Sequence, residues 1–122
     1  IDCIDMIEAP VHTCAKGWAA SMGCLLLAAG EKGNRYVMPN SITLLHEGSN
    51  GNQGTQSNFK SYADFSEKLN DRANLWLSGR TGKTVKQILK ANVIDNWMFA
   101  EDSIDFGFAD KIMDAKVYSG DE

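Results

Sequence analysis

The sequence is poor in the features that several large classes of protein require, namely paired cysteines, an excess of positive charge and long apolar runs. Cysteine occurs only three times in 122 residues, without close-paired spacing, which argues against a disulfide framework or a zinc site and favours a reducing compartment. The 12 lysines and arginines are outnumbered by 16 aspartates and glutamates, and this net charge of −4 argues against nucleic acid as a partner. With no apolar run long enough to cross a membrane and no secretory segment at the start, we expect a cytoplasmic protein without a membrane partner.

Signatures of nucleotide and metal chemistry are also missing. The glycine-rich segment 48–54 lacks the GK[ST] ending with which a phosphate-binding loop closes. We therefore expect no cofactor and no metal. A composition of 43% hydrophobic and 23% charged residues is ordinary for a globular chain. Because a chain of 122 residues can bury one core but not two, we expect residues 1–122 to form a single domain.

Short apolar and β-branched segments alternate with helical ones in the first half of the chain. The patterns predict the end of a helix at residues 2–7, a buried helix at 22–29, and strands at 11–15, 35–38 and 42–46. This alternation predicts an α/β fold with parallel strands and crossover helices.

A long amphipathic helix is predicted after the glycine-rich segment. Apolar and small residues recur there at steps of three and four, with charged residues between them: Phe59, Tyr62, Ser66, Leu69, Ala73 and Trp76. Gly79 and Gly82 are expected to end this helix. Taken alone, such a stripe is typical of a helix that covers its own core.

Residues 17–23, GWAASMG, place the hydroxyl of Ser21 in a run of small residues directly before the apolar helix. Such a turn can hold a nucleophile rigidly with its oxygen accessible, and the next backbone N–H can stabilise an oxyanion. The segment lacks the first glycine of the G-x-S-x-G motif, and the alternative is a hydroxyl that caps the helix. Cys24 begins the apolar run, so we interpret it as a core residue rather than a nucleophile.

Two histidines could act as the base for such a serine. His12 lies in a predicted strand with no acid at useful spacing, and we interpret it as structural. His46 ends the predicted strand 42–46 and precedes a turn-forming segment, where a base can reach substrate. Asp95 is flanked by apolar residues, so we expect a partly buried carboxylate that needs a partner. Four further carboxylates could also orient the imidazole: Glu101, Asp102, Asp105 and Asp110.

Three blocks of the chain, residues 17–23, 39–46 and 95–107, occur in the order expected for a serine, histidine and aspartate site. In order and spacing they resemble the segments around the catalytic residues of the Clp protease proteolytic subunit, a member of peptidase family S14 and of the ClpP/crotonase-like superfamily. Residues 106–112 resemble the closing segment of that family. The resemblance implies an α/β fold of repeated β-β-α units, with a protruding helical handle at about residues 49–80.

The same resemblance implies the roles of the site residues. Ser21 would attack the scissile carbonyl, His46 would accept the serine proton, and Asp95 would hold the imidazole. The Met22 N–H would supply one oxyanion donor. In the family the second donor comes from a Ser-Pro-Gly-Gly-type loop that precedes the segment matching residues 1–7. The sequence is therefore expected to lack the N-terminal third of the family's chain and, with it, the second donor.

Partners follow from the resemblance as well. It implies a serine endopeptidase that cleaves unfolded proteins or peptides inside an oligomeric chamber of heptameric rings, with ATP used by a separate AAA+ unfoldase. The handle would be a self-association surface. One alternative is a catalytically silent Clp-like structural or assembly subunit. Another is a crotonase-like acyl-CoA enzyme, since such enzymes use related backbone oxyanion holes on thioesters.

Overall fold

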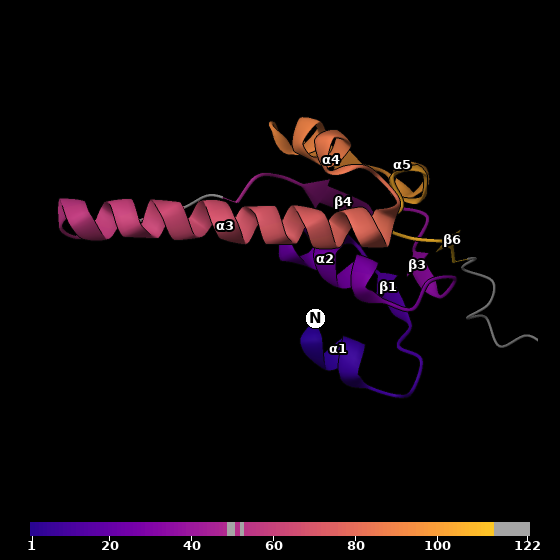
Figure 1. Cartoon of the computed structure of the whole chain (residues 1–122). Helices are drawn as coiled ribbons and strands as arrows, with labels where there is room; N and C mark the ends of the chain where they lie inside the picture. Colours follow the sequence, from indigo (N-terminus) through magenta and orange to yellow (C-terminus); the bar gives the residue numbers. More distant parts are fainter. Residues whose placement is uncertain (49–50, 52, 114–122) are drawn as a thin grey trace, which may run out of the picture.

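The computed structural model of the protein describes residues 1–48, 51 and 53–113 (Figure 1). Its helices are α1 (Asp2–Met6), α2 (Met22–Ala29), α3 (Gln56–Thr81), α4 (Val85–Asn92) and α5 (Ala100–Phe106). Its strands are β1 (Thr13–Ala15), β2 (Trp18–Ala20), β3 (Arg35–Val37), β4 (Ile42–Leu45), β5 (Asn96–Met98) and β6 (Lys111–Ile112). No helix in the described ranges is both long and apolar enough to cross a membrane.

The described strands form two small sheets, in the orders β1-β3-β6 and β2-β4-β5. The β1–β3, β2–β4 and β3–β6 pairings are parallel, whereas β4–β5 is antiparallel. The chain order β1-β2-α2 is followed by β3-β4-α3, so a β-β-α unit repeats, and in each unit the first strand joins one sheet and the second strand the other. The predicted α/β fold of repeated β-β-α units is therefore confirmed.

Helix α2 lies in the centre of the core, as the unbroken apolar run predicts. Cys24 and Ala28 are fully buried, and Leu27 is nearly so. The helix packs against strands of both sheets and against α3. The core also includes Val37, Leu45, Leu77, Ile88 and Phe108. Met22 and Leu26 on the same helix remain exposed, so only the side formed by Cys24, Leu27 and Ala28 is enclosed, and it gives the turn before α2 a rigid support.

A buried ion pair joins two residues that lie far apart in the sequence, Arg35 and Asp110. Arg35 on β3 is 3% exposed, and its Nε and Nη2 donate to the two carboxylate oxygens of Asp110 at 2.9 and 2.6 Å. Arg35 Nη1 donates to the Arg80 carbonyl at the end of α3 at 3.1 Å, and the Gly33 N–H donates to Asp110 at 2.7 Å. The hydrogen bonds from Arg35 lower the pKa of Asp110 to about 2. The ion pair therefore holds the end of α3 and the segment before β6 against the start of β3.

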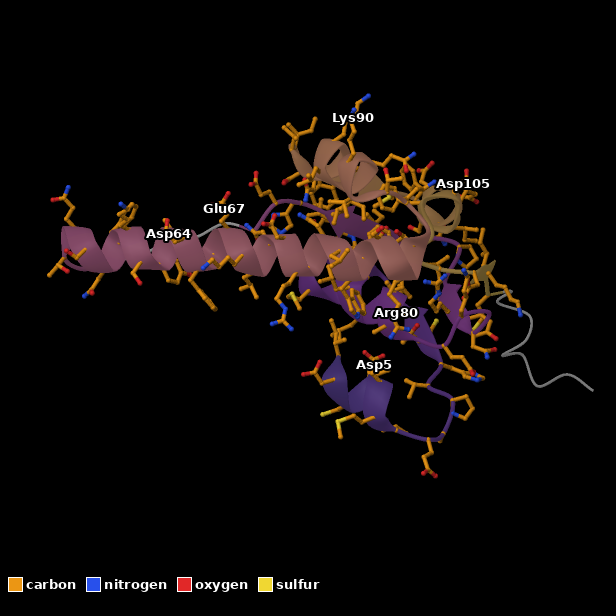
Figure 2. The ribbon with its side chains drawn as sticks, viewed as in Figure 1. Asp5, Asp64, Glu67, Arg80, Lys90 and Asp105 are labelled. Carbon is orange, nitrogen blue, oxygen red and sulfur yellow. The ribbon has the colours of Figure 1, made fainter. Side chains whose placement is uncertain are left out.

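Helix α3 projects beyond the rest of the molecule. Figure 1 shows its N-terminal half extending away from both sheets, as a protruding handle would. Phe59 and Phe65 on this half are 57% and 59% exposed, and Leu69 at the middle of the helix is 54% exposed, whereas Leu77 near the other end is buried. Of the stripe, Ser66 is buried and Ala73 and Trp76 are half-buried, whereas Phe59, Tyr62 and Leu69 are exposed, so the interpretation as a helix covering its own core holds only for part of the stripe. At that end an ion pair between Arg80 and Asp5 attaches α1 to α3 (Figure 2).

Several boundaries differ from the sequence predictions. Gly79 lies inside α3, contrary to the prediction, whereas Gly82 ends the helix as predicted, in the left-handed conformation that glycine adopts without strain. Strands β2 and β5 were not predicted, because β2 consists of Trp18 and two alanines and β5 has only three residues. The handle prediction includes residues 49, 50 and 52, which lie outside the described part of the chain.

Candidate active site

The three candidate residues flank one edge of the β2-β4-β5 sheet. Ser21 follows the last residue of β2, His46 follows the last residue of β4, and Asp95 precedes the first residue of β5. Since β2 is parallel to β4 and β5 is antiparallel to it, these positions meet at the same edge. Strand β4 is central, so His46 lies between the other two in the order of the sheet. Adjacent strands are about 4.8 Å apart, which brings residues far apart in sequence close together.

Ser21 has an unusual backbone conformation. It is the one non-glycine residue with a positive φ among the described residues, with φ 53° and ψ −117°. Its N–H donates to the Leu44 carbonyl on β4 at 2.9 Å, so the turn is fixed to the central strand. A strained backbone costs about 1–3 kcal/mol and persists only where the surroundings enforce it. The turn leaves the Ser21 side chain exposed at the N-terminus of α2.

The hydroxyl of Ser21 makes no capping hydrogen bond to α2. The alternative interpretation of Ser21 as a side-chain helix cap is therefore wrong. The Ser21 carbonyl oxygen instead accepts hydrogen bonds from the N–H and the thiol of Cys24, at 3.1 and 3.0 Å. Burial raises the pKa of the Cys24 thiol to about 12, so it stays protonated near neutral pH. The prediction that Cys24 is a core residue is confirmed.

His46 and Ser21 line the same cavity, which has a volume of about 530 Å³. It is bounded by β4 and the residues after it, the start of α2, one side of α3, and α4. His46 is partly buried. A base and a nucleophile that open into one cavity can both reach a bound substrate.

Asp95 differs from the sequence prediction in its environment. Its side chain is exposed rather than partly buried, because the chain turns there between α4 and β5 at the edge of the sheet. Asp95 does not line the cavity, and across the described ranges no side-chain hydrogen bond links it to His46 or links His46 to Ser21. Of the other carboxylates considered, Asp110 is paired with Arg35 and Asp102 accepts from the Phe99 N–H.

Sequence reasoning missed the polar part of the cavity. Asn74 and Asn92 line it, are 6% and 8% exposed, and are joined by a 3.5 Å hydrogen bond from Asn92 Nδ2 to Asn74 Oδ1. The available signal was the helical spacing of Asn70, Asn74 and Leu77. This spacing places the three residues on one face of α3, next to the apolar stripe. Within the described residues, no three His, Cys, Asp or Glu side chains gather as a metal site would require.

The fold and the site can be set beside known protein families. The sequence model of the Clp protease family matches residues 1–116 of the 122. The match covers both sheets, all of the described helices and all three candidate residues. The matched residues contain the repeated β-β-α units, the projecting helix α3 and the strained turn at Ser21. The chain belongs to the Clp protease family.

Proposed function

We propose that this chain is the proteolytic subunit of a Clp-type serine endopeptidase, with Ser21, His46 and Asp95 as its catalytic residues. The observation that carries the proposal is their common position at one edge of the β2-β4-β5 sheet, with His46 directly after the central strand. A nucleophile, a base and an orienting carboxylate in that spatial order are what acyl-enzyme hydrolysis requires.

The proposed reaction has two halves. The Ser21 oxygen attacks the scissile carbonyl carbon while His46 takes the hydroxyl proton, and His46 then gives that proton to the leaving amine as the C–N bond breaks. Water next attacks the acyl-serine, with His46 accepting its proton, and the Ser21 oxygen leaves as the hydroxyl. Asp95 holds the imidazole in the productive tautomer and stabilises its protonated form.

The N-terminus of α2 is the proposed site of oxyanion stabilisation. Met22 is the first residue of the helix, and the first N–H groups of a helix have no intrahelical partner. Its N–H follows the nucleophile directly, as in other nucleophile turns. Loss of one such donor costs on the order of 10²–10³ in rate, so this group is an essential part of the proposal.

The substrate is proposed to be an unfolded protein or peptide, cleaved inside a chamber formed by heptameric rings of this chain. The projecting half of α3 supports the self-association, because its aromatic side chains, Phe59, Tyr62 and Phe65, are exposed. A separate AAA+ unfoldase would use ATP to deliver the substrate. The free thiols of Cys3 and Cys14 are exposed, which suits a reducing cytoplasm.

The experiment is labelling with a fluorophosphonate, which reacts with an activated serine, followed by mass spectrometry of the modified peptide. We expect modification of Ser21 and its loss in the Ser21→Ala and His46→Ala variants. Ser61→Ala is the matched control, since Ser61 is an exposed serine on α3 that does not line the cavity. Labelling of Ser21 that survives His46→Ala, or no labelling of a folded and assembled sample, contradicts the proposal.

A second candidate function is a catalytically silent Clp-like assembly subunit. One observation favours it: the side chains of Ser21, His46 and Asp95 are not joined by hydrogen bonds within the part of the chain that the structure describes. Such a subunit would assemble with the same mass as an active one but would leave Ser21 unlabelled. The labelling experiment on the assembled protein therefore separates the two functions.

A further inference from the structure

The cavity beside Ser21 and His46 has three chemically distinct parts. Its walls are apolar, formed mainly by Met22, Leu25, Phe59, Leu77 and Leu89. Its volume of about 530 Å³ lies within the range of about 300–1,000 Å³ typical of ligand pockets. It can therefore hold a long side chain of a substrate bound at Ser21.

The second part is polar and almost fully enclosed. Asn74 and Asn92 share one hydrogen bond, which uses Nδ2 of Asn92 and Oδ1 of Asn74. Among the described residues, nothing donates to the Asn92 Oδ1 or accepts from the Asn74 Nδ2, although both side chains are more than nine-tenths buried. Neither atom is completely sealed from the cavity, since no fully enclosed side-chain polar atom in the described ranges lacks a partner. A ligand that donates to the Asn92 oxygen would satisfy one of these two groups, while the Asn74 Nδ2 requires a separate acceptor.

The third part is acidic. Glu47, Glu67 and Asp71 line the cavity and are exposed, whereas no lysine or arginine is among its described lining residues. Glu67 and Asp71 are one turn apart on α3, and Glu47 follows directly after His46. Figure 2 shows Glu67 on the edge of α3 that faces the chain leaving β4. The cavity thus carries a negative charge beside the proposed nucleophile.

We propose that this cavity selects a lysine or arginine side chain of the substrate, an inference that rests on the proposed function of Ser21. The apolar walls fit the aliphatic stem, the Asn92 oxygen accepts from the cationic head, and the carboxylates neutralise its charge. An aliphatic substrate side chain would fill the walls but leave the Asn92 oxygen without a donor. Sites with unsatisfied buried polar groups discriminate strongly against such ligands.

The first test measures binding without chemistry. Nα-acetyl-lysine amide and Nα-acetyl-norleucine amide differ only by the terminal ammonium, and each is titrated into the full chain while the side-chain amide signals of Asn74 and Asn92 are followed by NMR. We expect the lysine compound to shift these signals and to bind about tenfold more tightly than the norleucine compound, because several partly exposed charge contacts each contribute a few tenths to one kcal/mol.

Variants test whether the carboxylates of the cavity, rather than the overall negative charge of the protein, cause the lysine preference. Glu67→Gln/Asp71→Asn should remove most of the lysine preference, whereas Asp105→Asn should keep it, because Asp105 is an exposed carboxylate on α5 outside the cavity (Figure 2). Equal or tighter binding of the norleucine compound overturns the proposal. So does a lysine preference that persists in the double variant, or binding that leaves the Asn74 and Asn92 signals unmoved.

The second test uses two fluorogenic peptides that are identical except for lysine or norleucine before the scissile bond. We expect kcat/KM for the lysine peptide to be about tenfold higher, and this ratio to fall in Glu67→Gln/Asp71→Asn. Cleavage that depends on Ser21 but favours norleucine overturns the lysine preference and leaves the proposed function intact. Lysine-selective binding without labelling of Ser21 overturns the proposed function and leaves the lysine preference intact. The two failures are therefore distinguishable.

Discussion

Leu45 of β4 is registered against Asn96 of β5, as the last pair of an antiparallel ladder. His46 directly follows Leu45, and Asp95 directly precedes Asn96, so both residues lie just beyond the same end of the ladder. Strand pairing therefore places the backbones of the proposed base and of its proposed orienting carboxylate side by side, although Asp95 is exposed and lies outside the cavity. This relationship gives Asp95 a role that can be measured separately from stability.

Asp95→Asn should slow fluorophosphonate labelling of Ser21 by about 10²-fold or more, because the imidazole loses the group that fixes its tautomer. The free energy of unfolding should change by less than about 0.5 kcal/mol, since Asp95 is exposed. Labelling kinetics and urea unfolding check the two expectations. Asp105→Asn, which removes an exposed carboxylate from α5, is the control. An unchanged labelling rate would remove Asp95 from the mechanism.

The ion pair between Arg35 and Asp110 should dominate the response of the fold to single charge changes. Asp110→Asn leaves the guanidinium of Arg35 buried at 3% exposure without its carboxylate, and should destabilise the protein by about 3 kcal/mol. Urea unfolding at pH 7 measures this loss. Asp105→Asn again removes one negative charge, but it breaks no ion pair in the described structure. A difference of less than 0.5 kcal/mol between the two variants would contradict the prediction.

The same pair predicts how stability depends on pH. The pKa of Asp110 falls from 3.8 to about 2 in the folded chain, so folding favours the ionised carboxylate. This contribution is present above about pH 4 and is lost as the pH falls from 4 towards 2, where the folded protein also takes up the proton. The difference in unfolding free energy between the wild type and Asp110→Asn should shrink over this window. A difference that stays constant from pH 5 to pH 2 would contradict the sign.

Gly107 and Gly82 form a matched pair of helix ends. Both are left-handed, with φ +99° and +75°, but a Cβ on Gly107 would lie 2.2 Å from the Thr81 carbonyl oxygen whereas a Cβ on Gly82 would meet nothing within 4 Å. Gly82→Ala should therefore cost only the backbone strain of about 1–2 kcal/mol. Gly107→Ala should cost clearly more, because α5 and the end of α3 must move apart. Equal losses on thermal or urea unfolding would show that the close approach is not needed.

The parts of the fold that the sequence predicts well are those set by long, regular patterns. The apolar run gives α2 and its burial, and the three-to-four spacing gives α3. The positions that failed depend on three-dimensional context. Gly79 stays helical because the C-terminal end of α3 is fixed to Arg35 through the Arg80 carbonyl. Apolar neighbours predict burial of Asp95, but the side chains of Trp97 and Phe99 are themselves exposed.

The residues of the candidate site also divide into those that a local pattern predicts and those that depend on three-dimensional context. The small-residue turn identifies Ser21, because a short local motif determines its geometry. The positions of His46 and Asp95 depend on the sheet order β2-β4-β5, which no local pattern contains. The polar part of the cavity also escapes sequence reasoning. Asn74 and Asn92 come from two helices, α3 and α4, and only their packing brings the two amides together.

The exposed half of α3 predicts self-association. Phe65 on this half and Leu69, one turn further along the helix, are more than half exposed and do not line the cavity. If they cover one another in an oligomer, light scattering should give a mass far above the 13.4 kDa of one chain, and Phe65→Glu/Leu69→Glu should lower that mass. Ser61→Glu places a charge at another exposed position of the helix without removing apolar surface, and should keep the assembly. A monomeric wild type would contradict the role of this surface, and equal loss of mass in the Ser61 variant would assign the effect to charge alone.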